Sequence, residues 1–196
     1  MTIRDYKYLY FKEKLDNIIS RDHVKNDTLL ERMVRLAPDG MILEFGVFTG
    51  STINRMAAVT SRHIYGFDSF EGLPEDWVEN MTVGYFKCEI PSVSSNVTLV
   101  KGFFDASLQP FLDENPGLVG FCHIDCDLYS STKCVLDALS SRFQDGTLIL
   151  FDELACYRGY ENHEYKAFLE FLCNNDFDFE YVGRRTNESF GIRLIK

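Results

Sequence analysis

The most constraining feature of this chain is the run from Leu43 to Thr52, which reads L-E-F-G-V-F-T-G-S-T. It has the pattern of a short buried strand ending in an acid, then a glycine-containing turn, then the start of a helix. Glycine lets the backbone of such a turn approach a ligand closely. A second expected strand, residues 63–67, leads into Asp68. An acid there can accept hydrogen bonds from a ribose diol, so the unit predicts a nucleoside site.

The spacing of the glycines limits the classes of ligand that this turn is expected to bind. The turn is Gly46-x-x-x-Gly50 and lacks the G-x-G-x-x-G pattern of dinucleotide dehydrogenases, and Phe48 stands where the middle glycine would face a pyrophosphate. A bulky side chain there favours a ligand without phosphates, such as S-adenosylmethionine. Three alternatives remain: a nicotinamide-dependent reductase, a non-catalytic protein that binds a nucleoside or a divalent ion, and a turn whose glycines serve only its own geometry.

Strand and helix patterns alternate along the chain. This predicts an α/β fold in which a parallel sheet carries helices on both faces. The last two strands are joined by a short polar loop, so they should form a hairpin with one antiparallel strand, and Arg184 and Arg185 are expected only to decorate its turn. Strands are expected at 41–45, 63–67, 97–101, 118–124, 147–151, 177–183 and 189–195, and helices at 3–19, 27–37, 51–60, 106–113, 130–142 and 161–174.

Composition limits the class of protein. A chain of 196 residues is expected to form one domain, 1–196, with an N-terminal helical segment at 1–37 and a core at 40–196. Its net charge of −10 disfavours a nucleic-acid partner. The six cysteines form no C-x-x-C pair, and no signal peptide or membrane-spanning stretch is visible, so we expect a cytoplasmic protein with reduced cysteines and no membrane contact. The N-terminal helices should pack on the sheet, with a homodimer face or an active-site cover as alternatives.

Acids stand at four of the first five expected strand ends. They are Glu44, Asp68, Asp125 and the adjacent pair Asp152-Glu153. Ligands of open α/β sheets bind beyond the carboxyl ends of the strands, and like charges gathered there are costly unless a cation lies between them. If the strands that end at Asp125 and Asp152 are neighbours, three or four carboxylates converge from Asp125, Asp127, Asp152 and Glu153. Such a set suits Mg²⁺ or Ca²⁺ and predicts a divalent metal site.

Several nearby residues have two interpretations. Asp127 belongs either to the carboxylate group or, like Ser130, to the cap of the next helix. His123, inside an apolar strand, is expected to be a structural or supporting residue rather than a ligand. His163 either lines the pocket as a base or begins a helix. The long polar stretch 69–96 is expected to form a lid, because loops of this length in compact domains are usually functional.

Together these motifs resemble the class I S-adenosylmethionine-dependent methyltransferases of the macrocin O-methyltransferase type. The matching segments are L-E-F-G-V-F-T-G-S-T, Y-G-F-D-S-F-E-G-L-P, V-K-G-F-F-D-A-S-L, H-I-D-C-D-L-Y-S-S-T and L-I-L-F-D-E, which cover residues 40–195 and leave 1–37 outside. The resemblance implies a Rossmann-like sheet of seven strands in the order 3-2-1-4-5-7-6, with the last strand antiparallel. It also implies Mg²⁺-assisted transfer of a methyl group to a hydroxyl of a small molecule, often a sugar.

The resemblance further implies roles for individual residues. Asp127 would be the general base, with His163 as a second catalytic candidate, and Asp125, Asp152 and Glu153 would bind Mg²⁺. The cofactor would be held by Glu44, Gly46, Phe48, Thr49, Gly50, Ser51 and Thr52 at its methionine end, by Asp68 and Ser69 at its ribose, by Phe104 and Asp105 at its adenine, and by Asp125.

The chain departs from the family in two places. The family's metal pair is commonly two aspartates, whereas this chain has Asp152-Glu153, and the longer glutamate shifts one ligand position. The region between the second and third strands also looks shorter than in the antibiotic enzymes. Because that region shapes the acceptor pocket, the identity of the acceptor does not follow from the resemblance.

Overall fold

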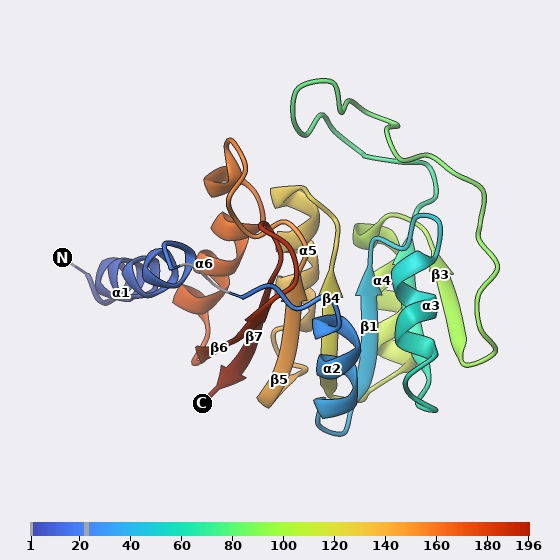
Figure 1. The fold of residues 1–196 in the computed structure, drawn as a ribbon, viewed down its shortest axis with the longest axis horizontal. Coiled ribbons are helices and arrows are strands. Elements are labelled where there is room, and N and C mark those ends of the chain that lie inside the picture. Colours follow the sequence, from blue (N-terminus) through green and yellow to red (C-terminus); the bar gives the residue numbers. More distant parts are fainter. Residues whose placement is uncertain (1, 22–23) are drawn as a thin grey trace.

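One mixed sheet of seven strands runs through the centre of the structure (Figure 1). This computed structural model describes residues 2–21 and 24–196. The strand order is β3-β2-β1-β4-β5-β7-β6, and only β7 runs antiparallel to its neighbours, which confirms the predicted Rossmann-like arrangement. The strands are β1 (Met41–Phe45), β2 (Ile64–Asp68), β3 (Val97–Lys101), β4 (Val119–Ile124), β5 (Phe143–Phe151), β6 (Asp178–Arg184) and β7 (Phe190–Ile195).

The register of the central strands brings their ends to one level. Phe45 of β1 pairs with Ile124 of β4, and Ile124 pairs with Phe151 of β5. The next residues continue the ladder, since the Asp125 amide donates to the Phe45 carbonyl at 2.9 Å and the Asp152 amide donates to the Ile124 carbonyl at 2.9 Å. Acids that are far apart in sequence therefore meet at one edge of the sheet.

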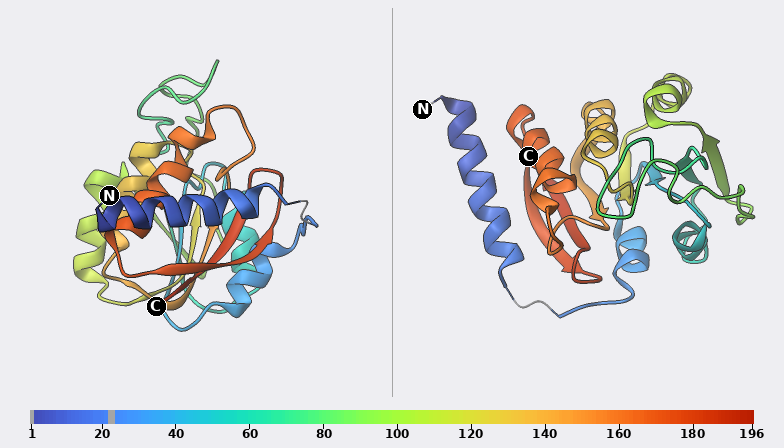
Figure 2. Two further views of the ribbon diagram at one scale, coloured as in Figure 1. Left: turned by 90° about the vertical axis from the view of Figure 1, so that its left-hand side faces the viewer. Right: turned by 90° about the horizontal axis from the view of Figure 1, so that it is seen from above.

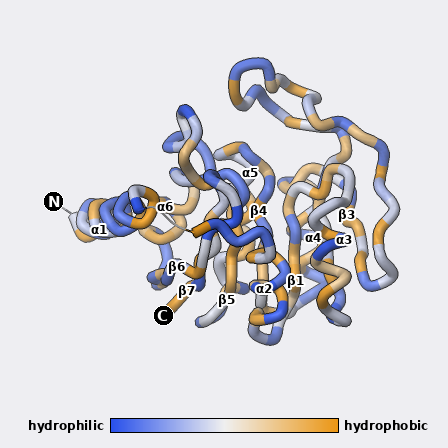
Figure 3. Tube along the Cα trace, viewed as in Figure 1, coloured by the Kyte–Doolittle hydropathy of each residue, from blue (hydrophilic) through white to orange (hydrophobic). Residues whose placement is uncertain are grey.

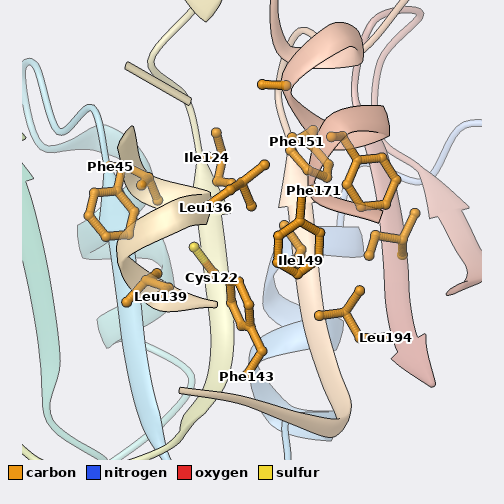
Figure 4. Packing of buried hydrophobic residues seen from close by; sticks show 14 of the residues in the cluster. Phe45, Cys122, Ile124, Leu136, Leu139, Phe143, Ile149, Phe151, Phe171 and Leu194 are labelled. Carbon is orange, nitrogen blue, oxygen red and sulfur yellow. The ribbon is translucent and has the colours of Figure 1, made fainter. Parts of the chain in front are cut away.

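Helices cover both faces of this sheet, as predicted (Figure 2). Alternating residues of each central strand point to opposite faces of the sheet. Phe45, Ile124 and Phe151 therefore belong to the hydrophobic core on one face, and Ile42 belongs to the core on the other face. Figure 4 shows the first core, in which Leu136 and Leu139 of a covering helix pack on the strands. Helices α4 (Phe104–Glu114), α5 (Tyr129–Leu139) and α6 (Glu164–Asn174) cover this face, and α2 (Leu29–Leu36) and α3 (Ser51–Ala57) cover the other.

The N-terminal helix α1 (Ile3–Ile19) packs mainly on α6, which Figure 2 shows beside it, and also on β6 at the edge of the sheet, where Phe11 meets Phe179. The Tyr165 hydroxyl donates to Asp16 at 2.6 Å, and Lys14 forms an ion pair with Asp178 at 2.5 Å. Helix α2 packs on the sheet as expected. In Figure 1, α1 lies at the end of the molecule away from β1, so it does not cover the central strand ends.

Element boundaries differ from the prediction at a few positions. Strand β5 begins at Phe143 instead of residue 147, because Phe143 is buried and pairs with Val119 of β4. The helix expected at 161–174 is divided into a 3-10 turn, η1 (Tyr160–Asn162), and α6, since the backbone of His163 between them is not helical. Helices α3 and α5 each end three residues earlier than expected, at Ala57 and Leu139.

Residues 69–96 form no helix or strand and extend beyond the carboxyl ends of the strands, at the top of Figure 1. Figure 3 shows hydrophobic and hydrophilic residues interspersed along this segment. Its own backbone pairs, since Leu73 donates to Tyr85 at 2.8 Å and Gly84 donates to Leu73 at 2.9 Å. The segment therefore has a defined path above the sheet.

Two further sequence expectations concern cysteines and membranes. All six cysteines carry free thiols, as expected. Among the described residues, no helix has the length and apolarity needed to span a membrane.

Replacing Phe11 with Ala tests how α1 is held. Phe11 is buried, with its ring centroid 6.5 Å from that of Phe179 on β6, so the variant should lose about 3–5 kcal/mol of unfolding free energy. The matched control is Leu9→Ala on the exposed side of the same helix, which should change stability by about 0.5 kcal/mol or less. Urea unfolding measures both, and equal effects would show that α1 is not docked through Phe11.

Candidate active site

A cavity of about 650 Å³ lies at the carboxyl ends of the strands. Its wall is built by the segments that follow β1, β2, β3, β4 and β5, which is the place where ligands bind in open α/β sheets. Nine of the residues proposed from sequence line it, namely Gly46, Phe48, Asp68, Ser69, Phe104, Asp105, Asp125, Asp127 and Glu153. The nucleoside motif and the carboxylates therefore share one cavity.

The glycine turn after β1 touches the end of β4. A Cβ on Gly46 would lie 1.7 Å from the Asp125 carbonyl oxygen, and the residue has a φ of +93°, so only glycine fits here. Asp68 holds the turn from the β2 side, because its Oδ2 accepts from the Val47 and Phe48 amides at 2.9 and 2.8 Å. The carboxylate keeps further lone pairs and faces the cavity, so its predicted contact with a ribose stays a prediction.

Three acids gather at the ends of β4 and β5. Asp125, Asp127 and Glu153 each offer one carboxylate oxygen, and these oxygens all lie within 4.8 Å of one another. The Oε2 atom of Glu153 is buried without a hydrogen-bond partner in the described part of the chain. The cap position of α5 is Leu128 and no side chain caps that helix, so the structure does not show the capping role considered for Asp127 and Ser130.

The crowding of these acids changes their ionisation. Burial, together with the charge of Asp152, raises the pKa of Asp125 well above its ordinary value, and burial with the charges of Asp125 and Asp152 does the same for Glu153. Burial raises the pKa of Asp127 to about 7. A cation between the three carboxylates would remove this repulsion, so oxygen ligands and charge both fit a hard divalent ion.

Asp152 does not belong to this cluster of three acids. Its side chain pairs with Arg185, and its Oδ1 lies 3.7 Å from Nε2 of His123. Burial alone would raise the pKa of Asp152, but the charged side chains of His123 and Arg185, the second of which also donates a hydrogen bond to it, lower this pKa to about 2. The acid expected to be a metal ligand is therefore, in this structure, the anion of a buried ion pair.

His123 connects Asp152 to a second acid, Glu44. Both His123 and Glu44 are fully buried, and Nδ1 of the imidazole lies 2.9 Å from Oε1 of the carboxylate. Burial opposes protonation of His123, but the nearby carboxylate of Asp152 and the hydrogen bond with Glu44 raise its pKa to about 10. His123 is thus the supporting residue that the sequence suggested. Glu44, which was expected to bind the cofactor, does not line the cavity, and its carboxylate is instead hydrogen-bonded with His123.

The prediction for the hairpin arginines was wrong. Arg185 is largely buried and binds Asp152, 33 residues away in sequence. Arg184 is buried and donates from Nε to the Asn187 carbonyl at 2.9 Å, with its guanidinium 4.6 Å from the centroid of the Phe190 ring. Neither arginine merely decorates the turn, because both side chains are largely buried and each makes specific contacts.

The remaining predicted residues lie outside the cavity wall. Thr49 and Ser51 are exposed, Gly50 packs near Pro91, and Thr52 is partly buried in α3. His163 does not line the cavity either, since its ring lies against those of Trp77 and Tyr157, with centroid distances of 6.4 and 6.2 Å. Burial lowers the pKa of His163, which favours a neutral ring at this contact.

The segment 69–96 contributes a large part of the wall, in keeping with its expected role as a lid. Trp77 is set against Tyr157, with their ring centroids 5.8 Å apart, and the Ser130 hydroxyl donates to Glu75 at 2.5 Å. The segment thereby contacts the residues that follow β4 and β5. Sequence reasoning did not assign the wall residues Gly72, Leu73, Pro74, Trp77, Met81, Phe86, Phe103, Cys126, Ser130, Ser131 and Cys134, most of which show no local periodicity.

Comparison with known proteins identifies the family. Residues 43–154, more than half of the chain, match a family described as a methyltransferase domain. The chain belongs to this family. It is a class I S-adenosylmethionine-dependent methyltransferase, and the nicotinamide-dependent alternative is therefore set aside. The narrower macrocin-type assignment stays a prediction.

Solved structures support the same fold. The methyltransferase is 26% identical to CalS11, described as a calicheamicin methyltransferase, with a TM-score of 0.67 over 84% of this chain and 75% of that chain. An apo structure, described as CalS11, TDP-rhamnose 3'-O-methyltransferase, matches at 26% identity with a TM-score of 0.61, again over 84% and 75% of the two chains. The O-methyltransferase NovP shares the fold at 19% identity, with a TM-score of 0.64 over 85% and 79% of the two chains. No curated protein matched the chain.

Three of the six non-glycine residues with positive φ in the described part of the chain lie in the cavity wall of this methyltransferase. Phe48, Phe86 and Asp127 line it with φ values of 47°, 69° and 62°, a region that side chains other than glycine rarely adopt. Each such residue costs about 1–3 kcal/mol and persists only where its surroundings enforce it. Strain of this kind clusters at functional sites, which agrees with the placement of the cavity.

Replacing His123 with Gln tests the buried charge network. The variant leaves Glu44 and Asp152 without the imidazolium, and it should lose about 3–5 kcal/mol of unfolding free energy near pH 6. Because the folded pKa of His123 is about 10, above an unfolded value of 6.5, its stabilisation is complete below the lower value and is lost as pH rises towards the higher one.

The difference in stability between wild type and the His123→Gln variant should therefore shrink from pH 6 to pH 10. Urea unfolding at several pH values measures it, and His63→Gln, at an exposed histidine, is the control. A difference that does not depend on pH would mean that His123 is neutral.

Replacing Arg185 with Met tests the second cation of the network. It should lower the unfolding free energy at pH 7 by about 3 kcal/mol, because Asp152 loses its partner in a buried site. The effect should decline as pH falls from about 4 towards 2, since the depressed pKa of Asp152 contributes stability only while the carboxylate is ionised. Arg193→Met removes an exposed ion pair from the same hairpin and should cost about 1 kcal/mol or less.

Proposed function

We propose that this methyltransferase transfers a methyl group to a hydroxyl oxygen of a small molecule such as a sugar, and that Mg²⁺ assists it. The observation that carries the proposal is the single cavity in which the glycine turn after β1 and the acids after β4 and β5 face the same space. A relative at 26% identity, described as a TDP-rhamnose 3'-O-methyltransferase, supports the choice of oxygen and of a sugar.

The β1 and β2 side of the cavity is assigned to the methyl donor. Gly46 and Phe48 would face its methionine end, Asp68 and Ser69 its ribose, and Phe104 and Asp105 its adenine, since all six residues line the wall. The ring of Phe104 is held by Phe45 at 5.4 Å between centroids, which gives that end a fixed shape. When bound, the donor supplies a methyl group on sulfur whose bonding electron pair stays on sulfur as the methyl leaves.

The β4 and β5 side is assigned to Mg²⁺ and the acceptor. Asp125 and Glu153 would hold the ion with Asp127 close by, because these carboxylates are the ones that the structure gathers. A hard cation there lowers the pKa of a hydroxyl group bound to it. Asp152, the third ligand expected from the family resemblance, would act instead through Arg185 and His123 by fixing the end of β5.

Asp127 is assigned as the base that accepts the hydroxyl proton. It is 7% exposed, and its carboxylate lies within 4.8 Å of the Asp125 and Glu153 oxygens that would hold the ion, so it would be close to the proton of a hydroxyl bound to that ion. Its left-handed backbone directs the chain out of β4 and into α5, which fixes the position of the carboxylate in the wall. His163, the other predicted catalytic residue, is assigned to support of Trp77, because their rings are in contact.

Two substitutions separate these roles. Asp127→Asn should lower methyl transfer by about 10²–10⁴-fold, the usual contribution of a general base, while S-adenosylhomocysteine affinity is kept. Glu153→Gln should weaken Mg²⁺ binding at least about tenfold and raise the thermal midpoint without Mg²⁺, because one of three crowded carboxylates becomes neutral. Transfer of labelled methyl groups to a panel of glycosides, with calorimetric titration of each ligand, measures both.

The control for both variants is Asp113→Asn, at an exposed acid on α4, which should leave every readout unchanged. Full activity of the wild type in the presence of a chelator would overturn the role of Mg²⁺. Full activity of Asp127→Asn would overturn the assignment of the base.

A further inference from the structure

Four acids come directly after β4 and β5, but the structure gathers only three of them into one cluster. Carboxylate oxygens of Asp125, Asp127 and Glu153 all lie within 4.8 Å of one another. Asp152, the fourth acid, is close by, because after burial its charge has the largest effect on the pKa of Asp125. A divalent ion at the cluster would therefore find a fourth carboxylate beside it, unless another group already holds that carboxylate.

Arg185 holds the carboxylate of Asp152. Nη2 of its guanidinium donates a hydrogen bond to Oδ1 of Asp152, and the two side chains form an ion pair. The same oxygen lies 3.7 Å from Nε2 of His123, which is beyond hydrogen-bonding distance. The side chains of Arg185 and Asp152 are 14% and 15% exposed, so little water screens their attraction. Arg185 is therefore the direct partner of Asp152.

This ion pair rests on a single contact of a single residue. Among the described residues, Arg185 is the only lysine or arginine that forms an ion pair with one of the four acids, and neither Lys101 at the end of β3 nor Arg158 after β5 forms one. The Nε atom of Arg185 is buried without a hydrogen-bond partner in this part of the chain, so the two-pronged arrangement typical of strong arginine–carboxylate pairs is not formed. One substitution at Arg185 should therefore release Asp152.

The number of charged ligands strongly affects how tightly an oxygen-lined site binds a hard cation. Arg185 reduces the attraction of the cluster for such an ion in two ways. It occupies Asp152, and its own positive charge lies close to the other acids. Although burial lowers the pKa of Arg185, the charges of Asp152, Asp125 and Glu153 raise it, which shows this proximity.

We propose that Arg185 sets the number of carboxylates that reach Mg²⁺ in this methyltransferase. By binding Asp152 it withholds a fourth carboxylate and leaves the cluster of three acids to face the ion, so Mg²⁺ binds more weakly than the four acids would allow. Arg185 is thus a positioning residue, since it acts on the ion through Asp152. The inference rests on the proposed function, and it gives the β6–β7 hairpin a role at a cavity whose described wall contains none of its residues.

Replacing Arg185 with Met tests the proposal through Mg²⁺ affinity. Calorimetric titration of Mg²⁺ into the full chain near neutral pH should show at least about tenfold tighter binding to Arg185→Met than to the wild type, because Asp152 becomes free to bind the ion.

Loss of a nearby cation would by itself tighten Mg²⁺ binding, so a double-mutant cycle with Asp152→Asn separates the two effects. Asp152→Asn should weaken Mg²⁺ binding by at least about tenfold more in the Arg185→Met background than in the wild type, because Asp152 contacts the ion only after Arg185 is removed. A purely electrostatic effect of Arg185 would give Asp152→Asn the same effect in both backgrounds.

Two further variants serve as controls. Arg185→Lys keeps a positive charge beside Asp152 and should bind Mg²⁺ as the wild type does. Arg193→Met removes an exposed ion pair from the same hairpin and should leave Mg²⁺ affinity unchanged. Thermal unfolding shows that Arg185→Met is folded, and saturating Mg²⁺ should raise its midpoint more than that of the wild type, because a more tightly bound ligand stabilises the folded state more.

Crystals soaked in Mn²⁺ identify the ligands directly by anomalous scattering. In the wild type, the ion should contact Asp125 and Glu153 while Asp152 stays on Arg185, and in Arg185→Met the ion should gain Asp152 as a ligand. Each of three results would overturn the proposal: Mn²⁺ bound by Asp152 in the wild type, no gain of Mg²⁺ affinity in Arg185→Met, or equal effects of Asp152→Asn in the two backgrounds.

The proposed function fails in a different way. Methyl transfer that persists in a chelator would refute the role of Mg²⁺ in catalysis, whereas the binding and ligand measurements would still decide the role of Arg185, since none of them uses activity. Absence of Mg²⁺ binding by the wild type and by every variant would refute both.

Discussion

The structure depends on how buried charge is balanced at the carboxyl ends of β4 and β5. Parallel strands in register bring their terminal acids together, and burial makes this crowding costly. Two cationic side chains offset part of this cost: His123 lies between Glu44 and Asp152, and Arg185 forms an ion pair with Asp152. The acids that face the cavity lack such partners, and this imbalance leaves the site ready to attract a cation.

The same arrangement links the two halves of the cavity. Gly46 lies against the Asp125 carbonyl, so the turn that is assigned to the methyl donor and the strand that carries the acids are in direct contact. Asp68 ties that turn to β2 through the Val47 and Phe48 amides. A donor and an acceptor bound here would be aligned by backbone that cannot shift independently, and alignment is the main service an enzyme gives to an in-line transfer.

The segment 69–96 supplies much of the apolar wall of the cavity. It forms no helix or strand of its own. The packing of Trp77 on Tyr157 and the hydrogen bond that Ser130 donates to Glu75 hold it in place. These contacts join the segment to residues that follow β4 and β5, so a change of acceptor would require compensating changes on more than one loop.

Local pattern alone indicated the seven strands, their helices and fewer than half of the cavity residues, because alternation of apolar residues, glycine turns and acids at strand ends are short-range signals. Their arrangement into the 3-2-1-4-5-7-6 order came from the resemblance to a known family. Only the tertiary structure decided which acid faces the cavity. Asp152 and Glu153 are adjacent in sequence, yet one binds Arg185 and the other joins Asp125. The different positions of these two acids depend on Arg185, which is 33 residues away from Asp152 on the β6–β7 hairpin. The packing of that hairpin against the rest of the protein cannot be read from the sequence around Asp152.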